Sequence, residues 1–228
     1  MKRLFVLSLL ALPAFGQETP IHLFHASAAV VGTEGLVVLP ESGGVAEKTL
    51  RDYDDGTVRF SEAVSSVRGT MEGGVAVTVS SITINDLDIL NGLVHADRLT
   101  VRATARQRLD EPEGQISFEG SSIAHLVVRG EARTLVVDTR RFDRNPTFAA
   151  FSHHARGDDD AMTERAGAFS GSIIRDWIIP IDGIGTLYLG HVTVKPGTRE
   201  LAMIRFVPAN GKGPVTIGRN EMNGVSMP

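Results

Sequence analysis

Residues 75–106 decide the fold, and they read VAVTVSSITINDLDILNGLVHADRLTVRATAR. Apolar residues alternate with small or polar ones on both sides of Asn91-Gly92, and the parity of the alternation changes between Val79 and Ile82 and again at Asn85-Asp86. A period of two is typical of half-buried β-strands, and a change of parity predicts a bulge or a passage between two environments. Asn-Gly is a strong hairpin signal because both residues tolerate the positive φ of a tight turn. The stretch therefore predicts two antiparallel strands joined at Asn91-Gly92.

Further strand patterns, separated by turn residues, fill much of the remaining chain. We expect strands near residues 117–118, 125–129, 134–138, 186–194, 201–207 and 214–218. Pro196-Gly197 and Asn210-Gly211 separate the last three, and such dipeptides are turn signals. Many short strands joined by such turns predict an all-β sandwich or barrel. Our prediction is all-β: an antiparallel β-sandwich-like single domain with hairpins and one irregular long connection.

The irregular connection is the stretch of residues 140–176, the least regular part of the chain. Within it, residues 159–168 form a helical pattern, and Asp158 or Asp159 stands before them as a candidate N-cap. We therefore expect a short helix here, inside either a long connection or an inserted subdomain.

The first 16 residues have the layout of a secretory signal peptide. Its parts are the basic residues Lys2 and Arg3, an apolar run at residues 4–12, Pro13, and the small-residue end Ala14-Phe15-Gly16. This order predicts cleavage after Gly16, and the apolar run is too short to span a bilayer. We expect residues 1–16 to be removed, and residues 17–228 to form a single β-rich domain that is extracellular or periplasmic.

Composition narrows the class of partner. The formal net charge of −4 falls to −6 once Lys2 and Arg3 are removed, so there is no reason to expect nucleic acid as a partner. The chain has no cysteine, which excludes disulfides, a thiol nucleophile and a lipid-modified cysteine. Beyond residue 16 no apolar run is long enough to cross a membrane, so we expect no transmembrane segment after signal cleavage. The partner class that remains is an extracellular or cell-surface ligand of unknown identity.

Three segments together resemble a known family. They are residues 87–97 (LDILNGLVHAD) running into 99–105, residues 181–189 (IDGIGTLYL), and the closing pair 201–207 and 215–218. In that order they resemble the secreted bacterial domains called choice-of-anchor type P, which carry a Gly-Leu-(Ile/Val)-x-Ala-Asp turn and strand and a late Gly-(Leu/Ile)-Gly-Thr strand. The resemblance covers most of residues 26–218, and it implies an exported, β-rich protein joined to a surface anchor, with no established enzymatic activity. The chain departs from the pattern at Asn91, where a second glycine is common, and in having no recognisable anchor after Gly218.

Asp97 and His95 are candidate site residues within the first of these segments. A His-x-Asp pair on one strand face is able to bind a metal ion, but such a site needs a third and a fourth ligand, and none is near in sequence. Aspartates that follow turns also commonly accept backbone N–H groups. We therefore expect a structural role for Asp97 and predict no metal ligands.

The densest polar cluster is the segment 153–160, which reads HHARGDDD. Asp158, Asp159 and Asp160, together with Glu164, could form a weak Ca²⁺ site, because hard cations prefer several carboxylate oxygens. The EF-hand spacing is absent, and a solvated acidic loop or a helix N-terminus is the commoner outcome. Ca²⁺ binding by this loop is left open, and we predict no cofactor. The Arg-Gly-Asp triplet at residues 156–158 is an integrin-type motif that recurs by chance.

Arg98, Arg102 and Arg106 share one face of the strand predicted after the hairpin, and Arg108 continues the parity. Such a stripe could meet an acidic glycan or a lipid headgroup. Arginines on the solvent face of a sheet also keep its edges soluble, and this is the role that we expect.

Motifs of known catalytic geometry are missing from the chain. It has no Gly-x-Ser-x-Gly elbow, no His-Glu-x-x-His, no Gly-x-x-x-x-Gly-Lys loop and no dinucleotide fingerprint. Trp177 and Tyr188 could line a sugar site, but one tryptophan and two tyrosines make a thin aromatic platform, so we expect both to be core or half-buried residues.

We predict a secreted bacterial structural or binding module of unknown ligand, with no catalytic residues and no catalytic activity. The alternative is a secreted, glycosidase-like hydrolase with two dispersed carboxylates, whose separation in space the sequence does not show.

Overall fold

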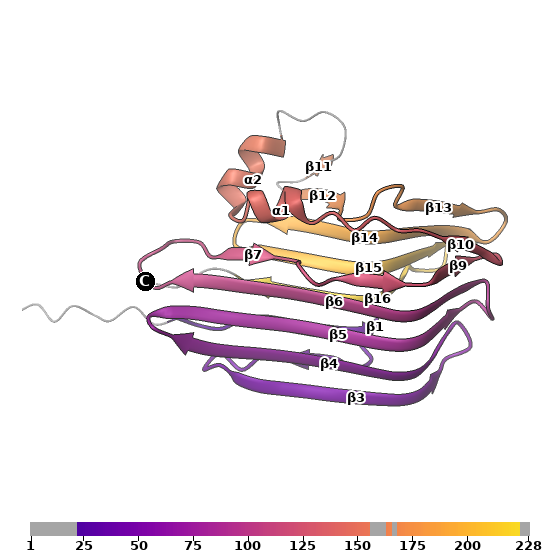
Figure 1. The fold of residues 1–228 in the computed structure, drawn as a ribbon, viewed down its shortest axis with the longest axis horizontal. Helices are drawn as coiled ribbons and strands as arrows, with labels where there is room; N and C mark the ends of the chain where they lie inside the picture. Colours follow the sequence, from indigo (N-terminus) through magenta and orange to yellow (C-terminus); the bar gives the residue numbers. More distant parts are fainter. Residues whose placement is uncertain (1–21, 156–162, 166–167, 224–228) are drawn as a thin grey trace, which may run out of the picture.

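Two antiparallel sheets pack face to face in the computed structural model, which describes residues 22–155, 163–165 and 168–223 (Figure 1). Sheet I consists of β3 (Gly44–Asp54), β4 (Val58–Glu72), β5 (Val75–Ile89), β6 (Val94–Arg108), β7 (Gln115–Ser117), β8 (Ser122–Ala124), β9 (Leu126–Val128) and β10 (Glu131–Arg133). Sheet II consists of β1 (Ala26–Val31), β2 (Val37–Val38), β11 (Thr163–Arg165), β12 (Ala168–Ser172), β13 (Ile178–Ile181), β14 (Gly185–Lys195), β15 (Thr198–Pro208) and β16 (Val215–Asn223). The all-β, antiparallel sandwich predicted from the strand and turn patterns is confirmed.

The order of the strands shows how the chain builds each sheet. Sheet I runs β10-β9-β6-β5-β4-β3, with β7 and β8 also paired to β6, so its long central strands are joined by successive hairpins. Sheet II runs β11-β12-β14-β15-β16-β1-β2, with β13 also paired to β14. The first described strands, β1 and β2, therefore complete a sheet that is otherwise built from the part of the chain after residue 162. The predicted signal peptide, residues 1–16, lies outside the described residues.

The hairpin predicted from residues 75–106 is confirmed as β5 and β6, at the centre of sheet I, with one register along their whole length. Three residues of the connecting turn, Leu90, Asn91 and Gly92, have positive φ of 57°, 55° and 85°. Asn91 and Gly92 were expected to adopt such angles, but Leu90 was not, because an apolar side chain is costly there. The Leu90 N–H donates to the Thr57 carbonyl at 2.7 Å, which ties this turn to the neighbouring β3–β4 turn.

Neighbouring segments of sheet I bend together at one transverse row of residues, which we call the kink row. It contains Asp52, Ser61, Asp86, Asp97 and His125, which fall opposite one another because each strand keeps the same register on both sides of the row. Asp52, Asp86 and His125, on alternate segments, have φ of 50°, 54° and 51°. Along β5 the buried side chains before Asp86 lie at even positions, apart from Val77, and after it at odd positions, so the change of parity predicted at Asn85-Asp86 is confirmed. The change predicted between Val79 and Ile82 is wrong, because the small residues of the even parity, and not Val75 and Val79, face the core there. The strands curve together towards the end of the sheet that carries the β5–β6 turn (Figure 1).

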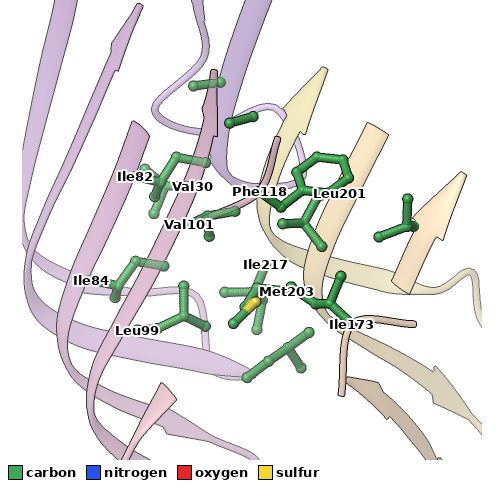
Figure 2. Packing of buried hydrophobic residues seen from close by; sticks show 14 of the residues in the cluster. Val30, Ile82, Ile84, Leu99, Val101, Phe118, Ile173, Leu201, Met203 and Ile217 are labelled. Atoms are coloured by element: carbon green, nitrogen blue, oxygen red, sulfur yellow. The ribbon is translucent and has the colours of Figure 1, made fainter. Parts of the chain in front are cut away.

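The hydrophobic core lies between the inner faces of the two sheets. Leu99 and Val101 of β6 face Met203 of β15 and Ile217 of β16, and all four side chains are fully buried (Figure 2). A Cβ atom at Gly218 would lie 2.7 Å from Val101 Cγ2 and 2.9 Å from Leu99 Cδ2. Because no side chain fits there, glycine at this position lets β16 approach β6 closely.

The long connection contains two helices, α1 (Arg140–Arg144) and α2 (Phe148–Ala155), beside β11 and β12 (Figure 1). The helix predicted over residues 159–168 is wrong where the structure describes it, because β11 and the start of β12 occupy those positions. Pairing of β12 with β14 supplies backbone hydrogen bonds and buries Phe169, and such tertiary pairing overrides a weak local helical pattern. None of the helices in the described part of the chain is long and apolar enough to span a bilayer.

The remaining strand predictions differ in outcome. The strands expected near residues 117–118 and 125–129 are present as β7 and β9, and the three late strands are present as β14, β15 and β16. Residues 134–138 do not form the expected strand, apart from a bridge between Val137 and Ile174. This segment crosses from sheet I to sheet II, so it pairs with a neighbour only at isolated points.

A buried arginine on β15 attaches the helical connection to the sandwich. Arg199 is 2% exposed, and its guanidinium lies 5.6 Å from the centre of the Phe151 ring of α2. It donates hydrogen bonds to four backbone carbonyls, those of Ile116, Phe142, Asn145 and Thr147. Burial lowers the pKa of Arg199 to about 10, so the side chain is still a cation at neutral pH. One side chain thus joins β7, α1, α2 and sheet II.

Candidate functional site

A cavity of about 340 Å³ lies at one end of the sandwich, and we call it the end cavity. Four turns form it, the β3–β4 and β5–β6 turns of sheet I and the β13–β14 and β15–β16 turns of sheet II. Its apolar lining consists of Leu90, Ile184, Phe206, Pro208 and Val215. Turns at the end of a sandwich are exposed, and they commonly carry binding residues because the sheets hold them in place.

Hydrogen bonds between the turns hold the end cavity in shape. The Ala209 N–H donates to the Ile184 carbonyl at 2.8 Å, which joins the two turns of sheet II. The Arg129 guanidinium of sheet I donates to the Asp182 carbonyl at 3.2 Å, and it also lies 3.8 Å from the Asp182 carboxylate. The two sheets are therefore linked beside the cavity.

A glycine allows Phe206 to form one wall of the end cavity. A Cβ atom at Gly185 would lie 2.3 Å from the Val207 carbonyl oxygen and 2.8 Å from Phe206 Cε2. The β14 backbone therefore packs directly against the Phe206 ring, and no other residue type fits at position 185.

The end cavity has few polar side chains, and the one charge among them is positive. Lys212 is the one charged residue in the lining, beside the neutral side chains of Thr57 and Asn210. Among the described residues, no carboxylate lies within ion-pair distance of the Lys212 ammonium group. Asn210 Oδ1 accepts the Lys212 backbone N–H at 3.1 Å, which orders the turn that carries the lysine. The arrangement suits a ligand with an apolar body and one anionic group, and it offers no carboxylate for acid or base catalysis.

A larger groove of about 690 Å³ lies along the crossing segment, between residues 132–136 and residues 175–180. Its charged residues are Arg133, Arg175 and Asp176, and Arg133 lies 2.9 Å from Glu131. Because charges of both signs are mixed there, the groove is less selective for an anion than the end cavity, whose one charged residue is a lysine.

The kink row brings a third residue to the predicted His95 and Asp97 pair. His125 Nδ1 lies 2.5 Å from Asp97 Oδ2, and His95 Nε2 lies 3.4 Å from Asp97 Oδ1. The hydrogen bond from His125, followed by the interaction with His95, holds the pKa of Asp97 below its ordinary value. Over the ranges that the structure describes, no group of three or more His, Cys, Asp or Glu residues is arranged to hold a metal ion. The carboxylate instead bridges two exposed imidazoles and ties β6 to the segment between β8 and β9.

Sequence reasoning did not identify His125 as the partner of Asp97. The two residues are 28 positions apart, and they meet only because β8 and β9 pair with β6 on either side of the kink row. The sole local signal was that His125 begins a predicted strand, which says nothing about its partner.

The other predicted site residues either lie outside the described part of the chain or form no binding site within it. Asp158, Asp159, Asp160 and the Arg-Gly-Asp triplet lie outside the described residues, so Ca²⁺ binding there stays a prediction. Glu164 is described, as an exposed residue of β11. Trp177 and Tyr188 are partly buried, as expected, with ring centres 5.6 Å apart.

The predicted arginine stripe lies on the outer face of β6. Arg98, Arg102 and Arg106 are exposed there. Arg108 is exposed as well, and it forms an ion pair with Asp110 at 2.9 Å. The alternation therefore gave the correct face for all four arginines.

Asp54 and Asp88 both line one very small cavity, of about 10 Å³. Asp88 already binds the Arg59 guanidinium at 3.2 Å and accepts the Gly92 N–H at 2.7 Å. A nucleophile needs a free oxygen, whereas both oxygens of the Asp88 carboxylate already have a partner. The pair therefore lacks both the space and the free groups of a glycosidase site.

Comparison with known proteins gives one result. A family model described as a domain of unknown function (DUF8256) matches residues 20–172, which include all of sheet I together with β1, β2, α1, α2, β11 and β12. No curated protein and no solved structure matches the chain.

Proposed function

Since the chain belongs to the DUF8256 family, whose description assigns no activity, we propose a function from the geometry: an exported, non-catalytic binding module whose end cavity takes a small organic anion. The observation that carries the proposal is the lining of that cavity, with five apolar residues and Lys212 as its one charged group. Ligand sites of proteins are typically concave and mostly apolar, with a few polar groups that orient the ligand. The cavity volume of about 340 Å³ falls within the usual range of such sites.

The binding module is favoured over the hydrolase for a chemical reason. The end cavity and the large groove offer one carboxylate between them, that of Asp176, whereas glycoside hydrolysis needs two that face each other. The apolar wall and the lysine can hold a molecule, but they supply neither of the two carboxyl groups that a glycosidase uses.

The proposal is tested with a matched pair of probes, 4-phenylbutyrate and 4-phenylbutanol, which differ in the anionic group. We expect Lys212→Met to weaken binding of the acid about threefold, the effect of one exposed ion pair, and to leave binding of the alcohol unchanged. Ile184→Trp fills the cavity and should abolish binding of both. Calorimetry or ligand-observed NMR measures the affinities.

Lys195→Met is the control, because Lys195 is exposed at the end of β14 and does not line the end cavity. The proposal fails if neither probe binds to the unaltered protein, or if Lys212→Met and Lys195→Met have the same effect on the acid.

Export is part of the proposal, and it is supported by the layout of residues 1–16 and by the resemblance to choice-of-anchor type P domains. Both point to a bacterial protein that works outside the cytoplasm, free or at the cell surface. The intact mass of the exported protein should correspond to a chain that begins at Gln17. A chain that stays in the cytoplasm and still begins at Met1 would contradict this part of the proposal.

A further inference from the structure

The outer face of sheet I contains a regular block of residues on its three long central strands, β4, β5 and β6 (Figure 1). The register of these strands places twelve residues of the outer parity in four rows of three, and all of them except Val77 are exposed or partly exposed. The rows are Val64–Thr83–Thr100, Ser66–Ser81–Arg102, Arg68–Val79–Thr104 and Thr70–Val77–Arg106. We call this block the arginine face.

The arginine face carries three positive charges and no acidic residue, although the whole chain has a formal net charge of −4. Glu47, Glu62 and Glu72 lie outside its borders, on β3 or in the adjoining rows. The three arginines are exposed, and their guanidinium groups have no ion pair among the residues that the structure describes. The charge on this face is therefore available to a ligand.

Other exposed arginines of the same sheet behave differently. Arg51 pairs with Glu62 at 2.9 Å, Arg59 with Asp88 at 3.2 Å, and Arg108 with Asp110 at 2.9 Å. Each of these three is neutralised by a carboxylate of its own sheet or of an adjoining turn. The contrast separates these three arginines from the unpaired set of the arginine face; Arg98, exposed in an adjoining row, also has no ion pair among the described residues.

The spacing of the three charges limits what they can bind. Arg102 and Arg106 are four residues apart on one strand, which corresponds to about 13 Å between their backbone positions. Arg68 lies in the row between them and two strands away, which places it about 12 Å from each. Side chains stand roughly perpendicular to a sheet, so the guanidinium groups are separated by similar distances, and a ligand that uses all three arginines carries several separated anionic groups.

The surface between the charges favours a sugar polymer. Six of the twelve positions carry hydroxyl groups, those of Ser66, Ser81, Thr70, Thr83, Thr100 and Thr104. The hydroxyls of Ser66 and Ser81 lie 2.9 Å apart, and each retains hydrogen-bonding capacity for a further partner. Hydroxyl side chains pair with sugar hydroxyls, and guanidinium groups pair with carboxylates and sulfates through two parallel hydrogen bonds.

From these observations we infer that the arginine face binds an acidic polysaccharide, which lies flat across β4, β5 and β6. This surface is separate from the end cavity, and the inference does not depend on the small-ligand function proposed there. A chain bound in this way would be held by three charge pairs on a hydroxyl-rich sheet, without an enclosed pocket.

The test compares two triple variants of the full chain that remove the same number of charges. Arg68, Arg102 and Arg106 are each changed to Gln in the first, and Arg51, Arg59 and Arg108 in the second. Polygalacturonate and dextran sulfate are the probes, neutral dextran is the control polymer, and binding is measured by biolayer interferometry at low and high salt. Thermal melts verify that both variants are folded.

We expect the unaltered protein to bind both acidic polymers, with an affinity that falls as salt rises, and not to bind dextran. The first variant should lose about 30-fold in affinity, from about threefold for each exposed ion pair, and the second less than about threefold. Equal losses in the two variants would overturn the inference, as would no binding of either acidic polymer. Phosphatidylserine vesicles or single-stranded DNA that bind as tightly, with the same dependence on the first three arginines, would show that the ligand class is wrong.

Discussion

Replacing Arg199 with methionine should lower the free energy of unfolding by about 3–5 kcal/mol, since several buried carbonyls lose a charged donor and each unsatisfied group costs about 1–3 kcal/mol. Methionine approximates the length of the arginine stem but donates no hydrogen bonds. The carbonyls of Ile116, Phe142 and Asn145 would then lose the donor that Arg199 supplies, whereas the Thr147 carbonyl keeps the Phe151 N–H at 3.0 Å. Each such loss in the interior is costly. Urea denaturation followed by circular dichroism measures the change.

Two further variants separate the hydrogen bonds of Arg199 from its charge. Arg199→Lys keeps the cation but cannot reach four acceptors at once, so its loss of stability should be smaller than that of Arg199→Met and still clear. Arg205→Met, on the same strand and only partly buried, should change stability by less than about 0.5 kcal/mol. If Arg199→Met is as stable as Arg205→Met, the helical connection is not held by this side chain.

Changing Val101 to aspartate should prevent stable folding, with a cost of at least about 4 kcal/mol. Val101 is fully buried at the centre of β6, where its methyl group packs against the backbone of Gly218 in the opposite sheet. A carboxyl group at this place has no hydrogen-bond partner, whether it is ionised or protonated. Thermal melts and one-dimensional proton NMR show whether the variant keeps a packed core.

The next residue along the strand is the matched control for this prediction. Arg102→Asp introduces the same group one position away, where the side chain points to solvent, so stability should change by less than about 0.5 kcal/mol. A Val101→Asp protein that melts like Arg102→Asp would mean that the inner and outer faces of β6 are assigned the wrong way round.

Whether the sequence predicts a site residue depends on how far away in the chain the partners of that residue lie. The outward direction of Arg102 and Arg106 follows from alternation within one strand, and the sequence predicted it. Their grouping with Arg68, from another strand, depends on the register of β4 against β5 and of β5 against β6. A slip of two residues in either pairing would keep every side chain on its face and still break up the group.

Local sequence was enough to predict the β5–β6 hairpin, the change of parity near Asp86 and the all-β class, because alternation and turn chemistry act between neighbouring residues. Local sequence also predicted a helix over residues 159–168, and this was wrong where it was tested, because pairing with β14 outweighed a weak helical pattern. Only the tertiary structure brought His125 to Asp97, buried Arg199 under the helical connection and closed four turns around the end cavity. Each of these depends on contacts between segments far apart in the chain, whose register and packing are set by the burial of both sheet faces together and not by the pattern of any one strand.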